Sequence, residues 1–297
     1  MPNLLRSLAV LSLCASAAFA QDNKWSDDVL CKRGKADACA RAGREAIDQG
    51  QEGDEKAYAR AKPLLEQGCK GNAPAACDDL GWIYDDGLGI KADKTKAVHF
   101  YTKACDGGLA RGCTNLGAMY VRGEGTKKDV KKAFGIFSKA CDGGSPTGCR
   151  DLGYRYLDGD GTAKNLPRAR ETFTRACTLG DSTGCFQSGY MQAEGEGGPA
   201  DVKTAIASYE TACEANQYGA CRNMALLYID GKNVTRSYAK ARTLLEKGCS
   251  NSHGASCYDL GVMYQNGEGV DANATRSQEL YKQACELKYE SGCKQLK

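Results

Sequence analysis

Residues 104–125 read ACDGGLARGCTNLGAMYVRGEG, with two cysteines eight positions apart between segments rich in helix-forming residues. The same spacing recurs along the chain and accounts for sixteen of its seventeen cysteines. From Cys69 onward the cysteine pairs begin every 36 residues, and only the first step, from Cys31, is 38. Self-similarity at a fixed period of this size is typical of stacked repeats and not of separate globular domains.

Each repeat is predicted to contain two helices. Cys113, Leu116, Gly117 and Tyr120 follow the i, i+3, i+4, i+7 spacing of one helix face, so the first helix is expected to start at the second cysteine of a pair. The GEG at 123–125 supplies a glycine for the left-handed position that ends a helix, and a second amphipathic helix follows. Such short helices bury their apolar faces only when neighbouring repeats stack.

A glycine recurs inside the first helix, as at Gly81, Gly117, Gly153 and Gly261. Glycine in a helix costs about 1 kcal/mol relative to alanine. Its recurrence therefore predicts a close approach of the two helices of a pair. Ala225 replaces it in one repeat, which favours a size requirement over a special backbone angle.

The cysteines are expected to form disulfides between the end of one helix pair and the start of the next. Antiparallel helices bring Cys105 and Cys113 within disulfide reach, although Cys113–Cys141 is an alternative at the same side of a hairpin. Loop-closure entropy, about 2.5 against about 3.6 kcal/mol, does not decide between them. Proximity in sequence favours the short pairing, so we predict Cys31–Cys39, Cys69–Cys77, Cys105–Cys113, Cys141–Cys149, Cys177–Cys185, Cys213–Cys221, Cys249–Cys257 and Cys285–Cys293.

The overall composition is that of a soluble protein. The chain is 42% hydrophobic and 26% charged, and its formal net charge of +3 is spread over 40 basic and 37 acidic residues. Because there is no basic run or stripe, a nucleic-acid partner is not expected. Monomeric behaviour is expected.

Residues 1–20 have the three parts of a secretory signal peptide: Arg6, an apolar run, and the small-x-small site Ala18-Phe19-Ala20. A competing lipoprotein signal at Cys14 would need a small residue before it, and Leu13 is not small. No other segment is expected to cross a membrane. An even number of cysteines in an exported chain favours disulfides, and the protein is expected in the periplasm or released from the cell.

The domain organisation expected from these features is a signal peptide at 1–20, a linker at 21–30 and one solenoid at 31–297. The solenoid would contain seven helix pairs with a C-terminal cap at 285–297. No metal or cofactor is expected, because the C-x7-C spacing is not that of zinc sites and the chain has only two histidines, His99 and His253.

The repeat pattern C-x7-C-x2-LG-x2-Y-x2-G-x-G-x7-A-x3-F/Y-x2-A resembles Sel1-like repeats, which are relatives of the tetratricopeptide repeats. Together with export, the cysteine pairs are most similar to the Helicobacter cysteine-rich protein family. The resemblance covers roughly residues 31–297 and implies an all-α, right-handed α/α solenoid of helix-pair repeats. It also implies that a concave face lined by first helices binds a protein or an extended peptide.

Residues that vary between repeats on the first helices are the candidates for such binding. Ten and seventeen positions after a pair's first cysteine lie polar residues, and the position between them, at thirteen, shares the same side of the helix. Position thirteen holds Trp82, Ala118, Tyr154, Tyr190, Leu226 and Val262 in successive repeats. We call these positions the first-helix stripe. Its candidate partner-binding residues are Asp79, Trp82, Asp86, Asn115, Arg122, Asp151, Tyr154, Asp158, Gln187, Tyr190, Asn223 and Asp259. A solvated polar stripe with Trp82, Tyr154 and Tyr190 partly in the core is the alternative interpretation.

Two other functions are carried as alternatives. The family resemblance implies weak β-lactamase or penicillin-binding activity, for which serine enzymes use S-x-x-K with S-D-N and K-T-G elements. The chain has S-x-x-K at Ser237–Lys240 and Ser291–Lys294 without the other elements, and Ser237 is expected to cap a helix. No catalytic residue is therefore assigned. The second alternative is a secreted host-interaction or structural factor.

Two glycosylation acceptor patterns occur, at Asn233-Val-Thr235 and Asn273-Ala-Thr275, both in expected loops between helices. Such short patterns arise often by chance, and modification is not predicted at either site.

Overall fold

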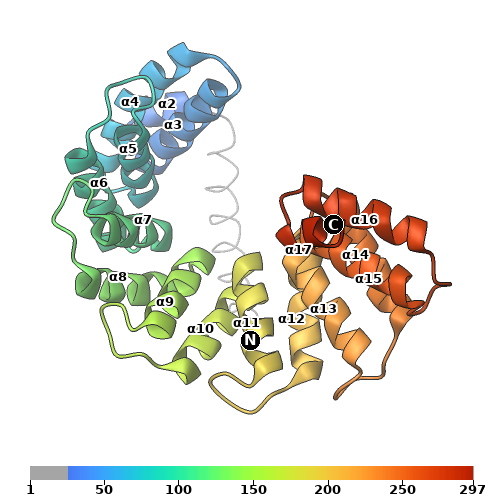
Figure 1. Ribbon diagram of the computed structural model, residues 1–297. Helices are drawn as coiled ribbons and strands as arrows, with labels where there is room; N and C mark the ends of the chain where they lie inside the picture. The colour runs from blue at the N-terminus through green and yellow to red at the C-terminus, as the bar shows by residue number, and fades with distance from the viewer. Residues whose placement is uncertain (1–25, 297) are drawn as a thin grey trace, which may run out of the picture. The chain divides into compact units, whose positions relative to one another are not determined.

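The computed structural model describes residues 26–296, and every regular element among them is an α-helix (Figure 1). The signal peptide expected at 1–20 lies outside the described residues. The expected linker at 21–30 is partly helical, because a short helix begins at Asp27. The helices are α2 (Asp27–Lys32), α3 (Ala36–Gln51), α4 (Glu55–Lys70), α5 (Pro74–Asp86), α6 (Lys94–Asp106), α7 (Ala110–Arg122), α8 (Val130–Asp142), α9 (Pro146–Asp158), α10 (Leu166–Thr178), α11 (Ser182–Glu194), α12 (Val202–Glu214), α13 (Tyr218–Asp230), α14 (Tyr238–Ser250), α15 (Gly254–Asn266), α16 (Ala274–Glu286) and α17 (Glu290–Lys294).

The chain forms two compact units, the first ending at Asp129 and the second beginning at Val130. In the first unit α3 packs on α4 and α5 on α6, and α7 follows. In the second unit the packed pairs are α9 with α10, α11 with α12, α13 with α14, and α15 with α16. Each unit is thus a stack of helix pairs, and the predicted all-helical repeat fold is confirmed.

The first helices start earlier than predicted. α7 begins at Ala110 and not at Cys113, and α9 begins at Pro146, three residues before Cys149. Proline is favoured in the first turn because it lacks an N–H that would have no helical partner there. Part of each interhelical link is therefore helical.

The recurring glycine brings the two helices of a pair together, as predicted. A Cβ added to Gly153 would lie 2.7 Å from the ring of Phe173, and a Cβ on Gly189 would lie 2.7 Å from the ring of Tyr209. Both rings are buried in the pair. In the repeat that carries Ala225, the buried residue at the ring position is Leu245. A smaller partner on the second helix leaves room for the extra methyl group.

Both glycines of a G-x-G turn have a structural role. Gly123 and Gly159 take the left-handed C-cap position, with φ of 72° and 79°, which confirms the predicted helix stop. The second glycine has a role that the sequence did not suggest. A Cβ on Gly161 would overlap the carbonyl of Val130, so this glycine lets the turn approach the start of the preceding repeat's second helix.

All eight predicted disulfides are present. The pairs are Cys31–Cys39, Cys69–Cys77, Cys105–Cys113, Cys141–Cys149, Cys177–Cys185, Cys213–Cys221, Cys249–Cys257 and Cys285–Cys293. Their Cα atoms are 4.3 to 4.9 Å apart. The alternative pairing of Cys113 with Cys141 is therefore wrong.

Side chains two positions before a pair's first cysteine connect successive repeats. Gln67 Nε2 donates to the carbonyl of Cys31 at 2.8 Å, and Lys247 Nζ donates to that of Cys213 at 3.0 Å. Each carbonyl also accepts a backbone N–H of its own repeat, from Gly34 and from Asn216. The side-chain bonds add a second partner from the next repeat.

Candidate functional site

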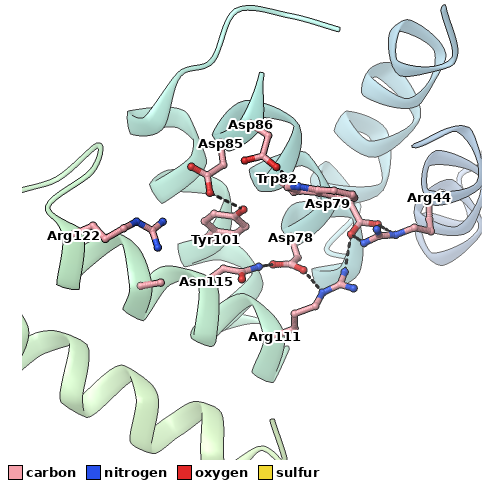
Figure 2. Close-up of a pocket in the computed structure, with 11 residues that line it drawn as sticks. Arg44, Asp78, Asp79, Trp82, Asp85, Asp86, Tyr101, Arg111, Asn115 and Arg122 are labelled. Carbon is pink, nitrogen blue, oxygen red and sulfur yellow. Dashed lines mark hydrogen bonds and ion pairs between the residues drawn. The ribbon is translucent and has the colours of Figure 1, made fainter. Parts of the chain in front are cut away.

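The first unit contains a pocket of about 430 Å³ on the side of the first helices (Figure 2). Its lining comes from four helices, because Arg44 lies on α3, Tyr101 on α6, and the remaining residues on α5 and α7. The lining residues are Arg44, Asp78, Asp79, Trp82, Asp85, Asp86, Tyr101, Arg111, Asn115, Ala118 and Arg122.

The structure brings five candidates from the first-helix stripe to this pocket. They are Asp79, Trp82 and Asp86 on α5, and Asn115 and Arg122 on α7. The repeat period explains the grouping, since equal positions on successive first helices lie beside one another when repeats stack.

The pocket contains an ion-paired carboxylate pair. Asp79 accepts bonds from Arg44 Nε at 2.9 Å and from Arg111 Nη2 at 2.7 Å. Asp78 accepts from Asn115 Nδ2 at 2.9 Å and pairs with Arg111 Nε. Asp79 is buried, with 3% of its surface exposed. Its charge is balanced by arginines from the repeats on either side.

A second ion network borders the pocket. Lys94 Nζ lies 2.6 Å from Asp85 Oδ1 and 3.7 Å from Glu124 Oε2, and Arg122 Nε lies 2.9 Å from the same Glu124 oxygen. Tyr101 donates its hydroxyl to Asp85 at 3.4 Å. Burial, reinforced by the negative charge of Asp85, raises the pKa of Tyr101, so its hydroxyl stays protonated as a donor.

Trp82 is held by two contacts. Its Nε1 donates to Asp86 Oδ2 at 2.6 Å, one helical turn further along α5. The guanidinium carbon of Arg44 lies 5.3 Å from the centre of the indole ring, within cation–π distance. The indole orientation is therefore fixed before any ligand arrives.

Sequence reasoning missed six of the lining residues. Arg44 and Ala118 occupy the stripe position of Trp82 in neighbouring repeats, and Asp78 and Asp85 each precede a predicted residue. Arg111 lies in the first turn of α7, a segment that was expected to be a loop. Tyr101 matched the core position of a second helix, which is where it packs, against Gly81.

The remaining candidates lie in the second unit, and several bond within the chain. Tyr154 accepts from Gln187 Nε2 at 3.1 Å and packs edge-on against Phe173. Asp151 accepts from Arg150 Nε at 3.0 Å. Burial raises the pKa of Asp151, while the Arg150 charge opposes that rise. Tyr154 therefore lies partly in the core, as in the alternative interpretation of the stripe.

Asn223 and Asp259 are also engaged within the chain. Asn223 Nδ2 donates to Tyr209 at 3.3 Å, and Arg222 Nε donates to Asp259 at 2.5 Å. Burial raises the pKa of Asp259 above its usual value. Asp158 and Tyr190, in contrast, are exposed on α9 and α11. Those two are the candidates of the second unit that a partner can reach without displacing an internal bond.

The serine considered for catalysis and the asparagines considered for glycosylation lie at helix caps or in a turn. Ser237 caps α14, as predicted, and its Oγ accepts from the Lys240 backbone N–H at 3.4 Å. Asn273 caps α16, accepting from the Arg276 backbone N–H at 2.9 Å, whereas Asn233 lies in the α13–α14 turn with φ of 61°.

Among residues 26–296, no cluster of three His, Cys, Asp or Glu side chains could hold a metal ion. No helix in that range is long and apolar enough to span a membrane.

Comparison with known proteins gives a family match. The model of the Sel1 repeat matches residues 74–109, 110–145, 146–181, 182–217, 219–253 and 254–289. The pair α3–α4, with its longer helices, is not among the matches. A search of curated proteins found no match.

Solved structures give further similarities. A protective antigen of uropathogenic Escherichia coli, which displays an SLR fold, is 26% identical with a TM-score of 0.81 over 91% of this chain. The match spans 57% of that antigen's length. A Sel1 repeat protein from Oxalobacter formigenes is 25% identical with a TM-score of 0.67, covering 83% of this chain and 96% of its own. Helicobacter pylori cysteine rich protein B is 35% identical with a TM-score of 0.37, covering 43% of this chain and 92% of its own.

Proposed function

The chain belongs to the Sel1 repeat family, and from this premise we propose that it binds a protein or peptide partner outside the cytoplasm through the first-helix stripe. Sel1 repeats typically mediate protein interactions. Stacked repeats of this kind present extended surfaces to which a partner can bind over several repeats.

The observation that carries the proposal is the pocket of the first unit. It opens on the first-helix stripe and is lined from four helices, so its shape depends on the stacking of repeats and not on one helix. A side chain of an extended partner would enter it. The second unit has exposed stripe residues of its own, Asp158 and Tyr190, that would offer contacts within that unit.

The proposed mechanism is binding to a preordered surface. Disulfides close the joints between successive pairs, and bonds such as Gln67 to the Cys31 carbonyl connect neighbouring repeats. A surface that is rigid before binding loses little conformational entropy when the partner docks, which leaves more of the contact energy as affinity.

Export is part of the proposal. The chain has eight disulfides. Disulfides persist in oxidising compartments and are rare in cytosolic proteins. They suggest a protein outside the cytosol, and we place it in the periplasm or outside the cell.

The proposal is tested by selecting peptides from a displayed library of random dodecapeptides on the oxidised protein. Two variants then measure dependence on the stripe: Tyr190→Ala, and Leu179→Ala as a control of matched exposure, since these side chains are 41% and 39% exposed. Selected peptides should lose affinity with Tyr190→Ala or with variants of the first-unit pocket, and should keep it with Leu179→Ala. Failure to select any peptide, or equal affinity for all variants, would overturn the proposal.

A further inference from the structure

The pocket of the first unit owes its space to a small residue. The stripe position thirteen residues after the first cysteine holds Arg44, Trp82, Ala118 and Tyr154 in successive repeats. Trp82 and Ala118 both line the pocket, so the methyl group of Ala118 leaves open the volume that a ring would fill. One side of this opening is the indole of Trp82 (Figure 2).

The end of α5 that faces this opening has unusual charge. Asp85 and Asp86 occupy the last turn of α5, which contains no basic residue. The C-terminal end of a helix is the negative end of its dipole, where cations stabilise and carboxylates do not. The corresponding pairs in later repeats are Val121 and Arg122, Leu157 and Asp158, Ala193 and Glu194, Ile229 and Asp230, and Gln265 and Asn266, so only this repeat places two acids there.

One of these two carboxylates forms an ion pair within the chain, and the other does not. Lys94 bonds Asp85 at 2.6 Å. Among the described residues, Asp86 accepts only the Trp82 Nε1 bond and makes no ion pair, although the charge of Lys94 acts on it from a greater distance. Two acids at the negative end of a helix, one of them without an ion pair, break a local rule, which is typical of a functional site.

The same repeat shows which group would fit. Arg44 lies over the indole of Trp82 and bonds Asp79, so the chain itself combines a guanidinium with this tryptophan and a carboxylate. Arginine suits such surroundings better than lysine, because its planar guanidinium both stacks on aromatic rings and forms paired bonds to carboxylates. The exposed carboxylate of Asp86, which bonds the indole N–H and makes no ion pair among the described residues, offers a second place of this kind.

We infer that this pocket receives an arginine side chain of the partner, which enters over Ala118, packs beside Trp82 and pairs with Asp86. This inference rests on the proposed function, since it names the chemistry of one side chain in the partner segment. It also predicts that the guanidinium, and not the length of the side chain, determines binding at the pocket.

The test uses capped pentapeptides with a single central residue flanked by alanines, added to the oxidised protein. The central residue is arginine, citrulline or lysine, and citrulline has nearly the same shape without the charge. The readout is the indole N–H resonance of Trp82, identified by its loss in Trp82→Phe. The arginine peptide should shift this resonance and bind about tenfold more tightly than the citrulline peptide, the ratio expected for one cation–π contact with an ion pair.

Three variants separate charge from shape. Asp86→Asn keeps an acceptor for Trp82 Nε1 and should reduce arginine-peptide binding about tenfold, with citrulline binding unchanged. Ala118→Tyr installs the residue of the next repeat and should abolish binding of all three peptides at Trp82. Asp271→Asn, at an exposed position in the turn before α16 and outside the first-helix stripe, should have no effect.

The outcomes are distinguishable from those of the proposed function. Equal shifts of the Trp82 resonance by arginine and citrulline peptides, or unchanged binding in Asp86→Asn, would overturn this inference. Stronger binding of the lysine peptide would overturn its choice of arginine. If those results appeared while selected dodecapeptides still depended on Tyr190, the inference would fail and the proposed function would stand.

Discussion

Arg111 on α7 donates through Nη2 to Asp79 on α5 at 2.7 Å, and Arg44 on α3 bonds the same carboxylate from the other side. A single buried carboxylate therefore joins three consecutive first helices. The ion pair is a structural feature of the stack, while Asp86 is exposed at the end of the same helix.

Asp79→Ala should destabilise the first unit. Asp79 is 3% exposed and its loss removes the carboxylate that joins Arg44 to Arg111. Both arginines can regain water, since 31% and 54% of their side chains are exposed, so we expect about 2 kcal/mol and not the about 3–5 kcal/mol of a fully buried pair. Urea unfolding measures the loss. Asp86→Asn is the control and should change stability by less than about 0.5 kcal/mol; equal effects of the two would contradict the assignment.

Gly153→Ala should also destabilise the protein, because the new methyl group would lie 2.7 Å from the Phe173 ring. Overpacking of this kind costs about 2 kcal/mol, and the better helix propensity of alanine offsets about 1 kcal/mol of it, so we expect a net loss of about 1 kcal/mol. Adding Phe173→Leu reproduces the Ala225 and Leu245 combination of another repeat and should recover part of that loss. A double-mutant cycle by thermal unfolding measures the coupling. Additive effects of the two changes would show that the glycine has another role.

Arg222→Gln should make stability depend on pH through Asp259. Burial already raises the pKa of Asp259 in the folded protein, and loss of the Arg222 charge would raise it further. A carboxyl whose pKa is raised on folding favours the folded state below its unfolded pKa and loses that contribution as the pH rises through the folded pKa.

The loss in Arg222→Gln should therefore be largest at neutral pH, about 2 kcal/mol, and should shrink as the pH falls toward about 4. Denaturant unfolding across that range gives the profile. The double variant with Asp259→Asn should show no such slope. A loss in Arg222→Gln that is independent of pH would contradict this account of the pair.

Replacing Cys105 and Cys113 together by serine should cost about 2.5 kcal/mol, the loop-closure entropy of a link this short. Proteolysis without reduction, followed by mass spectrometry, should first show each disulfide joining the two sides of one interhelical link in the wild-type protein. Peptides that join Cys113 to Cys141 would contradict the pairing seen in the structure.

The fold could be predicted from sequence because its determinants are periodic and local. Cysteine spacing, the Gly-x-Gly turns and the glycine beneath Phe173 each depend on residues within one helix pair, and the resemblance to Sel1 repeats is confirmed by the family match. The starts of the first helices were placed one turn late because a cysteine marks the disulfide and not the helix boundary.

The site was only partly predictable. The stripe period placed Trp82, Asp86 and Asn115 together, but the burial of Asp79 depends on arginines 32 and 35 residues away. Whether Arg111 reaches Asp79 is determined by how adjacent repeats stack. The distance between these two side chains cannot be read from their spacing in the sequence. The opening over Ala118 likewise appears only when a small residue is placed beside the indole in space.

The most direct test of the central claim is to locate a bound peptide on the protein. A selected dodecapeptide carrying a photo-activated cross-linker would be irradiated with the oxidised protein, and the linked residues identified by mass spectrometry. The account predicts links to the first helices, at α5 and α7 or at α9, α11, α13 and α15, competed by unlabelled peptide. Links confined to the second helices or to the interhelical turns would contradict it.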